Sequence, residues 1–306
     1  MKPIFNARSM FAIAAIAIST SVAAHAGYKF HTIDVPGAVE TKLVGINNKG
    51  VAVGSYTTST GQVFGWSEDL TTGAMTTQIN DPNGSTTELT GINDDGAMVG
   101  NYWSPAGHLE GVIFDTDGIR DIDYPSCTTL TISAVDNNRD FGGNCYYSQN
   151  GQAHVAGWLS WYGGGAGICT LNNSVTSISD NGNLWGGSCT NAGDPVIRGY
   201  VQWYPIYQAV LSYPGAISTR VTGTNDSFVA VGSYAMTANG TAHGFLLQDV
   251  RSSYTYTTVD VPHAKSTFMG KINNMNWIVG SYLDSAGKTH AFYGTPAKGT
   301  STLDQQ

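Results

Sequence analysis

The sequence has little charge. Only 12% of its 306 residues are Asp, Glu, Lys or Arg, and 14 basic residues stand against 22 acidic ones. Binding to phosphate backbones depends on Lys and Arg, so we expect no nucleic-acid partner. With 41% hydrophobic and 11% aromatic residues the chain can still build a core. The acidic excess is more simply a matter of solubility than of ligand binding.

Long hydrophobic runs are missing as well. The most apolar stretch, Phe11–Ala24, has about 14 residues, which is short of the roughly 20 that a membrane span needs. Lys2 and Arg8 precede it, and a small-x-small site ends at Ala26. This pattern is typical of a signal peptide, which we predict over residues 1–26. We therefore expect a secreted or periplasmic protein without a membrane span.

The helical hydrophobic period is also absent, so we expect almost no α-helix. One pattern instead occurs six times, in steps of 43 to 48 residues, which indicates a repeat architecture. In each copy two apolar runs flank an Asn/Asp/Gly turn, the signal of a β-hairpin. The copies are Leu43–Tyr56, Leu89–Tyr102, Ile132–Cys145, Val175–Cys189, Val221–Tyr234 and Met269–Tyr282.

Two further apolar runs follow each hairpin, so each unit is predicted to be a four-stranded antiparallel blade. We predict an all-β fold: a six-bladed β-propeller over residues 27–298, with residues 299–306 as a flexible tail. In the third unit the fourth strand is predicted at Gly167–Asn172. The chain begins with a strand of the fourth type, Phe30–Val35, and ends with one of the third type, His290–Gly294. The N-terminal strand is therefore expected to close the last blade and cover its edge.

The repeated pattern GIN..G..VGSY, then G..HAF, then TIDVPGA resembles a bacterial extracellular repeat family named HAF, after the tripeptide found here at 290–292. The resemblance covers residues 28–298. It is clear in units one, two, five and six, whereas other residues replace GIN at 134–136 and 177–179. It implies a repeat β protein of the exported compartment, and it implies no reaction.

All four cysteines lie in units three and four, and an even number in an exported chain indicates disulfides. Cys127 and Cys169 lie near the loop that precedes the first strand of a unit, whereas Cys145 and Cys189 replace the Tyr of VGSY. These two places meet at one end of an antiparallel hairpin. Of the three possible pairings we therefore predict Cys127–Cys145 and Cys169–Cys189. No CxxC or HxxxH spacing suggests a metal, and no cofactor is expected.

Aromatic residues are the candidate ligand-binding residues, because their rings can stack on sugars. One set repeats at the end of the second strand, near one mouth of the propeller: Tyr56, Tyr102, Tyr234 and Tyr282. Since these tyrosines repeat with the scaffold, the simpler interpretation is that each packs against the next blade and forms a hydrogen bond with a loop carbonyl. A second set departs from the repeat, which favours a functional role: Trp103, Tyr146, Tyr147, Trp161 and Trp203.

Catalytic residues remain unknown from the sequence. His154, His243 and His290 share one repeat position, which spreads them around the ring, so we expect each to form hydrogen bonds within its own blade. GxSxG, HExxH, P-loop and dinucleotide motifs are missing. Asp180–Trp185 matches part of the Asp box of sialidase propellers, but the five arginines after the leader lie at non-equivalent places.

The favoured function is an exported, monomeric, non-catalytic binding or interaction module for glycan or another cell-surface component. Two alternatives stay open. One is a carbohydrate-active or lactone-hydrolysing propeller enzyme, which predicts a deep central funnel lined with acids, histidine or a bound cation. The other is a structural surface or matrix protein.

Overall fold

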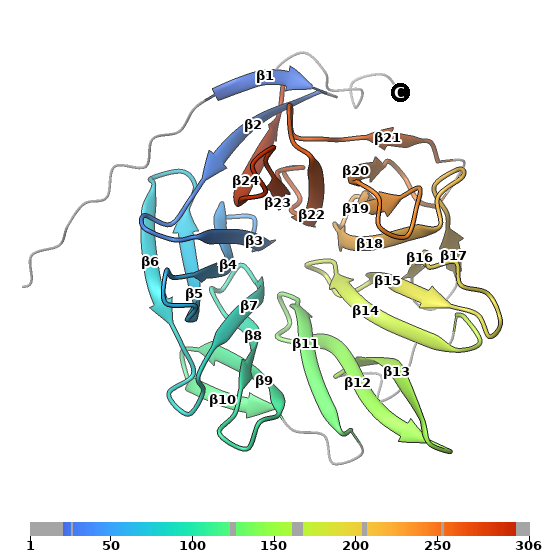
Figure 1. Cartoon of the computed structure of the whole chain (residues 1–306), viewed down its shortest axis with the longest axis horizontal. Coiled ribbons are helices and arrows are strands. Elements are labelled where there is room, and N and C mark those ends of the chain that lie inside the picture. The colour runs from blue at the N-terminus through green and yellow to red at the C-terminus, as the bar shows by residue number, and fades with distance from the viewer. Residues whose placement is uncertain are drawn as a thin grey trace, which may run out of the picture.

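The computed structural model describes residues 21–25, 27–122, 127–160, 168–203, 207–251 and 254–297. In these residues the regular structure consists of β-strands, and none of it is helical. Six antiparallel sheets are arranged around a central axis (Figure 1). The predicted six-bladed β-propeller is confirmed. None of the described segments is a helix that could span a membrane.

The strands of each blade run outward from the axis in chain order. The first three blades are β3 (Glu40–Ile46), β4 (Val51–Thr57), β5 (Val63–Asp69) and β6 (Ala74–Ile79); β7 (Thr87–Ile92), β8 (Met98–Trp103), β9 (Leu109–Asp115) and β10 (Gly118–Ile122); and β11 (Thr129–Val135), β12 (Phe141–Gln149) and β13 (Gln152–Leu159). The last three are β14 (Asn172–Ile178), β15 (Leu184–Thr190), β16 (Arg198–Trp203) and β17 (Tyr207–Leu211); β18 (Ser218–Thr224), β19 (Ala230–Ala235), β20 (Ala242–Leu247) and β21 (Tyr256–Thr258); and β22 (Ser266–Ile272), β23 (Ile278–Leu283), β24 (Thr289–Pro296) and β2 (Tyr28–Ile33).

The third blade differs from the prediction. Its described residues form three strands, and Ile168–Leu171, where a fourth strand was expected, are bends outside any strand. The side-chain oxygen Oδ1 of Asn173 accepts hydrogen bonds from the backbone N–H groups of Ile168 and Cys169. Such local side-chain-to-backbone bonds compete with strand pairing, so this segment forms the loop that leads into β14.

The N-terminal strand closes the ring as expected. β2 pairs antiparallel with β24, with Phe30 opposite Gly294 and Ile33 opposite Ala291. The Phe30 ring packs edge-on against Phe292, with ring centroids 5.6 Å apart, so closure also buries apolar surface. A further strand, β1 (Ser21–His25), pairs with the outer side of β2 and lies within the predicted signal peptide.

The glycine of the VGSY pattern is explained by a bulge between the first two strands of each blade. In the first blade the register shifts between Leu43 and Gly45. A Cβ atom on Gly54 would clash with the backbone carbonyl oxygen of Lys42, and the same clash recurs at Gly280 with the carbonyl of Phe268. Because the partner is backbone rather than a movable side chain, only glycine fits these positions.

The asparagine of the GIN pattern links neighbouring blades. The Nδ2 group of Asn47 donates to the carbonyl of Asn93 at 2.9 Å, and that of Asn93 donates to the carbonyl of Asp136 at 3.0 Å. Between the fifth and sixth blades Asn225 donates to the carbonyl of Asn273 at 3.0 Å, and across the ring closure Asn273 donates to that of Asn47 at 2.9 Å. We call these four contacts the axial amide bonds. They satisfy buried polar groups and fix the order of the blades around the axis.

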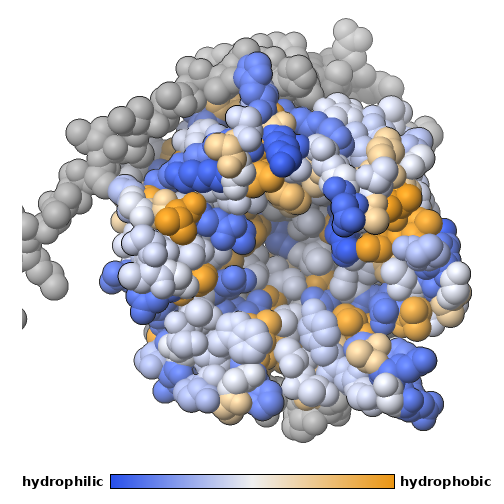
Figure 2. All heavy atoms as spheres, viewed as in Figure 1, coloured by the Kyte–Doolittle hydropathy of each residue, from blue (hydrophilic) through white to orange (hydrophobic). Residues whose placement is uncertain are grey.

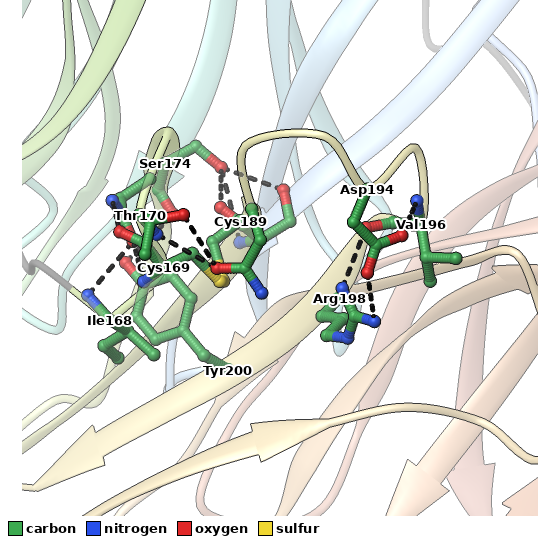
Figure 3. The surroundings of a disulfide bond; sticks show 12 residues. Ile168, Cys169, Thr170, Ser174, Cys189, Asp194, Val196, Arg198 and Tyr200 are labelled. Atoms are coloured by element: carbon green, nitrogen blue, oxygen red, sulfur yellow. Dashed lines mark hydrogen bonds and ion pairs between the residues drawn. A yellow bond between two sulfur atoms is a disulfide. The ribbon is translucent and has the colours of Figure 1, made fainter.

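The predicted disulfide pairing is confirmed. Cys127 is bonded to Cys145 and Cys169 to Cys189, with Cα–Cα distances of 5.2 and 5.7 Å. Figure 3 shows the second of these close to Tyr200, and Cys169, Cys189 and Tyr200 belong to one buried cluster. Persistent disulfides are typical of oxidising compartments, so the two bonds indicate a non-cytoplasmic, secreted protein.

Candidate functional site

The repeated tyrosines are packed inside their blades. Tyr56, Tyr102 and Tyr234 are at most 7% exposed, and Tyr282 is half-buried. The hydroxyl of Tyr234 is hydrogen-bonded to Thr258 Oγ1 at 3.1 Å, and that of Tyr282 to Thr32 Oγ1 at 3.0 Å, so each reaches the outer strand of its blade. Burial raises the pKa of Tyr234 to about 12. This geometry accounts for the repetition through packing, and a ligand-binding role for these tyrosines stays a prediction.

Two of the three repeated histidines, His243 and His290, form hydrogen bonds within their own blades, as expected. His243 Nδ1 lies 2.7 Å from Asp260 Oδ2, and His290 Nδ1 lies 2.7 Å from Asp34 Oδ2. The His290 ring also stacks on Tyr282, with centroids 5.1 Å apart. The His of the HAF tripeptide, on the third strand, therefore contacts the Asp of TIDV, which follows the fourth strand.

The residues that break the repeat fall into different environments. Trp103 is 48% exposed and Tyr146 is 39% exposed, whereas Tyr147 and Trp203 are half-buried. The Trp203 ring packs against Phe228, with centroids 4.7 Å apart. Trp161 lies outside the described residues. Of this set, Trp103 and Tyr146 have the most accessible rings.

Trp103 and Tyr146 belong to a larger group of exposed apolar side chains. These side chains lie at the end of the propeller where the innermost strands begin and the second strands end, spread around the ring. Every blade contributes at least one member, each at least 38% exposed: Val39, Trp103, Tyr146, Leu171, Ile217 with Met236, and Phe268. We call this group the apolar end face. Apolar side chains that gather on a surface mark an interaction site more often than scattered ones do.

Sequence reasoning missed most of the apolar end face because large apolar residues occupy these repeat places in only some of the blades. Val39, Leu171 and Ile217 precede an innermost strand, Met236 follows a second strand, and Phe268 lies within an innermost strand. One sequence signal could have identified part of this face, namely a large apolar residue directly before the first strand of a blade. In the view of Figure 2, apolar side chains form separate patches around a central hollow.

The central channel is narrow. A cavity within it holds about 20 Å³ and is lined by the innermost strands, with small residues such as Gly45, Gly91 and Ala134 beside aliphatic ones. That volume accommodates about one water molecule. In the sixth blade Lys271 occupies the position of Gly45, and its Nζ donates to the carbonyl oxygen of Thr176 across the channel. Burial lowers the pKa of Lys271 to about 7.

A ring of three acids and three amides, one from each blade, surrounds the axis at the opposite end from the apolar end face. Its members are Asn48, Asp94, Asn137, Asp180, Asp226 and Asn274. Asp180 Oδ2 accepts hydrogen bonds from the side-chain amides of Asn48 and Asn274, at 2.8 and 3.1 Å. Burial, together with the nearby carboxylates of Asp94 and Asp226, raises the pKa of Asp180 to about 6.

The carboxylates of this ring bond with amide groups. Asp94 Oδ2 accepts from Asn48 and Asn137, at 2.9 and 2.8 Å, and Asp226 Oδ2 accepts from Asn274 at 2.7 Å. Over the part of the chain that the structure describes, three or more His, Cys, Asp or Glu side chains nowhere form a group that could hold a metal ion. The ring therefore joins the hairpin turns of the six blades.

Comparison with known proteins places the chain by its fold. No protein-family model and no curated protein sequence matches it. In fold it is similar to Aleuria aurantia lectin, solved in complex with alpha-methyl-L-fucoside, with a TM-score of 0.52 and 10% identity over 86% of this chain and 93% of the lectin. It is also similar to the β-propeller domain of the Trilobed protease from Pyrococcus furiosus, with a TM-score of 0.51 and 7% identity over 92% and 94%.

TolB from Acinetobacter baumannii is a further neighbour, with a TM-score of 0.49 and 12% identity over 84% of this chain and 55% of that one. The chain covers 42% of a prolyl endopeptidase and 43% of the acylaminoacyl peptidase of Pyrococcus horikoshii, so it spans about half or less of these three chains. At such low identities the likeness shows a propeller and no shared activity.

Proposed function

We propose that this protein is an exported binding module that recognises a cell-surface component, with glycan as the favoured chemistry. The observation that supports this most is the apolar end face, to which every blade contributes an exposed apolar side chain. A globular protein that leaves such residues together on one surface commonly uses them for recognition. The resemblance to exported HAF repeats agrees with this role.

Glycan is favoured because the two exposed aromatic rings lie on adjacent blades. Trp103 ends the second strand of the second blade, and Tyr146 lies at the matching end of the third. Large, rigid rings that are partly polar contact the apolar faces of sugars at little cost in conformational entropy. The enzyme alternative required a deep funnel, and the cavity within the channel holds only about 20 Å³.

A glycan array of the exported protein tests the proposal, followed by calorimetric titration with the strongest saccharide on the array. Replacing Trp103 or Tyr146 by Ala is expected to weaken binding at least tenfold, since central aromatic contacts are often worth about 2 kcal/mol or more. Tyr207→Ala is the matched control, because Tyr207 is a similarly exposed tyrosine on an outer strand. Absence of any glycan signal, or equal affinity of all three variants and the wild type, would contradict the proposal.

A further inference from the structure

The first blade carries a groove that the repeat does not explain. It holds about 600 Å³, which is within the range of small-molecule sites, whereas the cavity within the channel has room for one water molecule. One wall is the loop Val35–Ala38, which leads from the last blade into the first. The other wall consists of Tyr56 and Thr58 at the end of β4, and of residues 73–75, 77 and 78 in and just before β6.

An irregularity in the outer strand of the blade shapes this groove. Ile79 pairs with Gly65, but Thr76 pairs with Ser67, so Thr77 and Gln78 are left out of the ladder. The backbone of Gln78 has a φ of 61°, in the left-handed region that residues with a side chain adopt at a cost of roughly 1–2 kcal/mol.

Other blades do not repeat this feature. The outer strands β10, β17 and β21 pair with their neighbours in continuous register, as does β2. A bulge with backbone strain in one of the five outer strands that the structure describes marks a departure from the scaffold. Such departures concentrate at functional sites.

The groove presents neutral chemistry. Polar groups come from the hydroxyls of Thr58 and Thr77 and the amide of Gln78, and apolar surface comes from Pro36 and Met75. The described residues that line the groove include no charged side chain. Tyr56 lies beneath the bulge, and hydrogen bonds with the Thr77 side chain and the Gln78 backbone hold its hydroxyl.

The neutral polar groups and the apolar surface of the groove favour some classes of ligand over others. A phosphate or a carboxylate finds no cationic partner among the lining residues, and the bulge interrupts the backbone edge that an extended peptide would need for pairing. A sugar offers hydroxyl groups to the threonines and the amide, and C–H faces to the apolar residues. The groove also adjoins the apolar end face, because Val39 directly follows the loop that forms its wall.

We propose that this groove is a subsite for a single neutral sugar residue, bound between the loop Val35–Ala38 and the bulge at Thr77 and Gln78. Because this inference takes the ligand to be a glycan, it rests on the proposed function. It goes further by naming an uncharged saccharide and by placing it on the first blade. The apolar end face then contacts the remainder of the glycan.

Three variants of the exported protein test the subsite. Thr77→Val removes a hydroxyl with little change of shape, and Gln78→Gly removes the amide while suiting the left-handed backbone. Thr76→Val is the matched control, because Thr76 is an exposed neighbour on the same strand that does not line the groove. Each variant is titrated calorimetrically with maltose, cellobiose, lactose, chitobiose and a fucosylated lactose, and with sialyllactose and a uronate-containing disaccharide as acidic saccharides. Its melting temperature is compared with that of the wild type.

We expect Thr77→Val and Gln78→Gly to weaken binding of a neutral saccharide at least tenfold, with Thr76→Val within twofold of the wild type. Loss of binding in Trp103→Ala together with unchanged affinity in both groove variants would overturn the subsite and leave the proposed function standing. Binding of sialylated or uronate-containing glycans alone would do the same. No binding of any saccharide, neutral or acidic, would overturn both.

Discussion

Replacement of Asp180 by Asn tests the electrostatics of the axial ring. The pKa of Asp180 is raised from 3.8 to about 6, so the folded protein holds its carboxylate at neutral pH at a cost of up to about 3 kcal/mol. Asn keeps an oxygen that can accept the amide of Asn48 at 2.8 Å, and it removes the charge. Partial exposure and the loss of charge-assisted hydrogen bonds reduce the gain, so we expect about 1–2 kcal/mol of added stability at pH 7.5.

The pH dependence of this effect has a defined sign. An acid whose pKa is raised on folding retains its proton longer in the folded state, so wild-type stability falls as the pH rises from about 4 to about 6. The Asn variant does not pay this cost. Both proteins should therefore unfold at the same temperature near pH 4, and at pH 7.5 the variant should melt about 2–6 °C higher.

Thermal unfolding followed by circular dichroism at both pH values measures the difference. Asp95→Asn is the control, because Asp95 is exposed in the hairpin turn that follows Asp94, and its replacement should change little at either pH. A variant of Asp180 that is less stable than the wild type at pH 7.5 would refute the reasoning. That result would mean that the ring requires the negative charge.

Three further predictions concern the ends of the chain and a buried acid. Intact-mass measurement of the exported protein should give a chain that starts directly after Ala26. In that chain β1 is removed and β2 is the outer edge of the last blade. A mass that includes residues 1–26 would contradict the predicted signal peptide. Deleting Tyr28–Pro36 should lower the melting temperature or precipitate the protein, whereas deleting Gly299–Gln306 should change little; equal tolerance would contradict closure by β2. Burial and the neighbouring Asp69 raise the pKa of Glu68, and within the described residues its Oε2 has no hydrogen-bond partner. Glu68→Gln should therefore raise the melting temperature at neutral pH and leave it unchanged near pH 4. Equal melting temperatures of the variant and the wild type at neutral pH would contradict this prediction.

The parts of the fold that could be predicted from sequence are those fixed by local spacing. The hairpin of each unit, the disulfide pairs and the closure by β2 all follow from the repeat, because equivalent residues fall at equivalent places. The outer strand of the third blade could not be predicted in this way. The amide of Asn173 there binds the backbone of Ile168 and Cys169, a contact that a hydrophobic pattern does not reveal.

The candidate sites were harder to predict than the fold. Repetition pointed to tyrosines that the structure buries, such as Tyr102 at 2% exposure. The apolar end face draws on several repeat positions, each of which is apolar in only some of the blades, and the groove depends on a register shift beside Gln78. Spacing along one chain does not show which side chains six different blades bring to one surface, nor where a strand leaves its ladder.

The axial amide bonds have a consequence for how the ring opens. They run in one direction, each blade donating to the next, and the series is interrupted where Asp136 and Ser179 replace the asparagine in the third and fourth blades. These are the same two blades that contain the disulfides. Each disulfide lies inside one blade and ties the residues before its first strand to its second strand. In a reducing environment these two blades lose that tie, in the arc of the ring that already lacks the axial amide bonds, so we expect reduction to loosen this arc before the seam between the first and last blades.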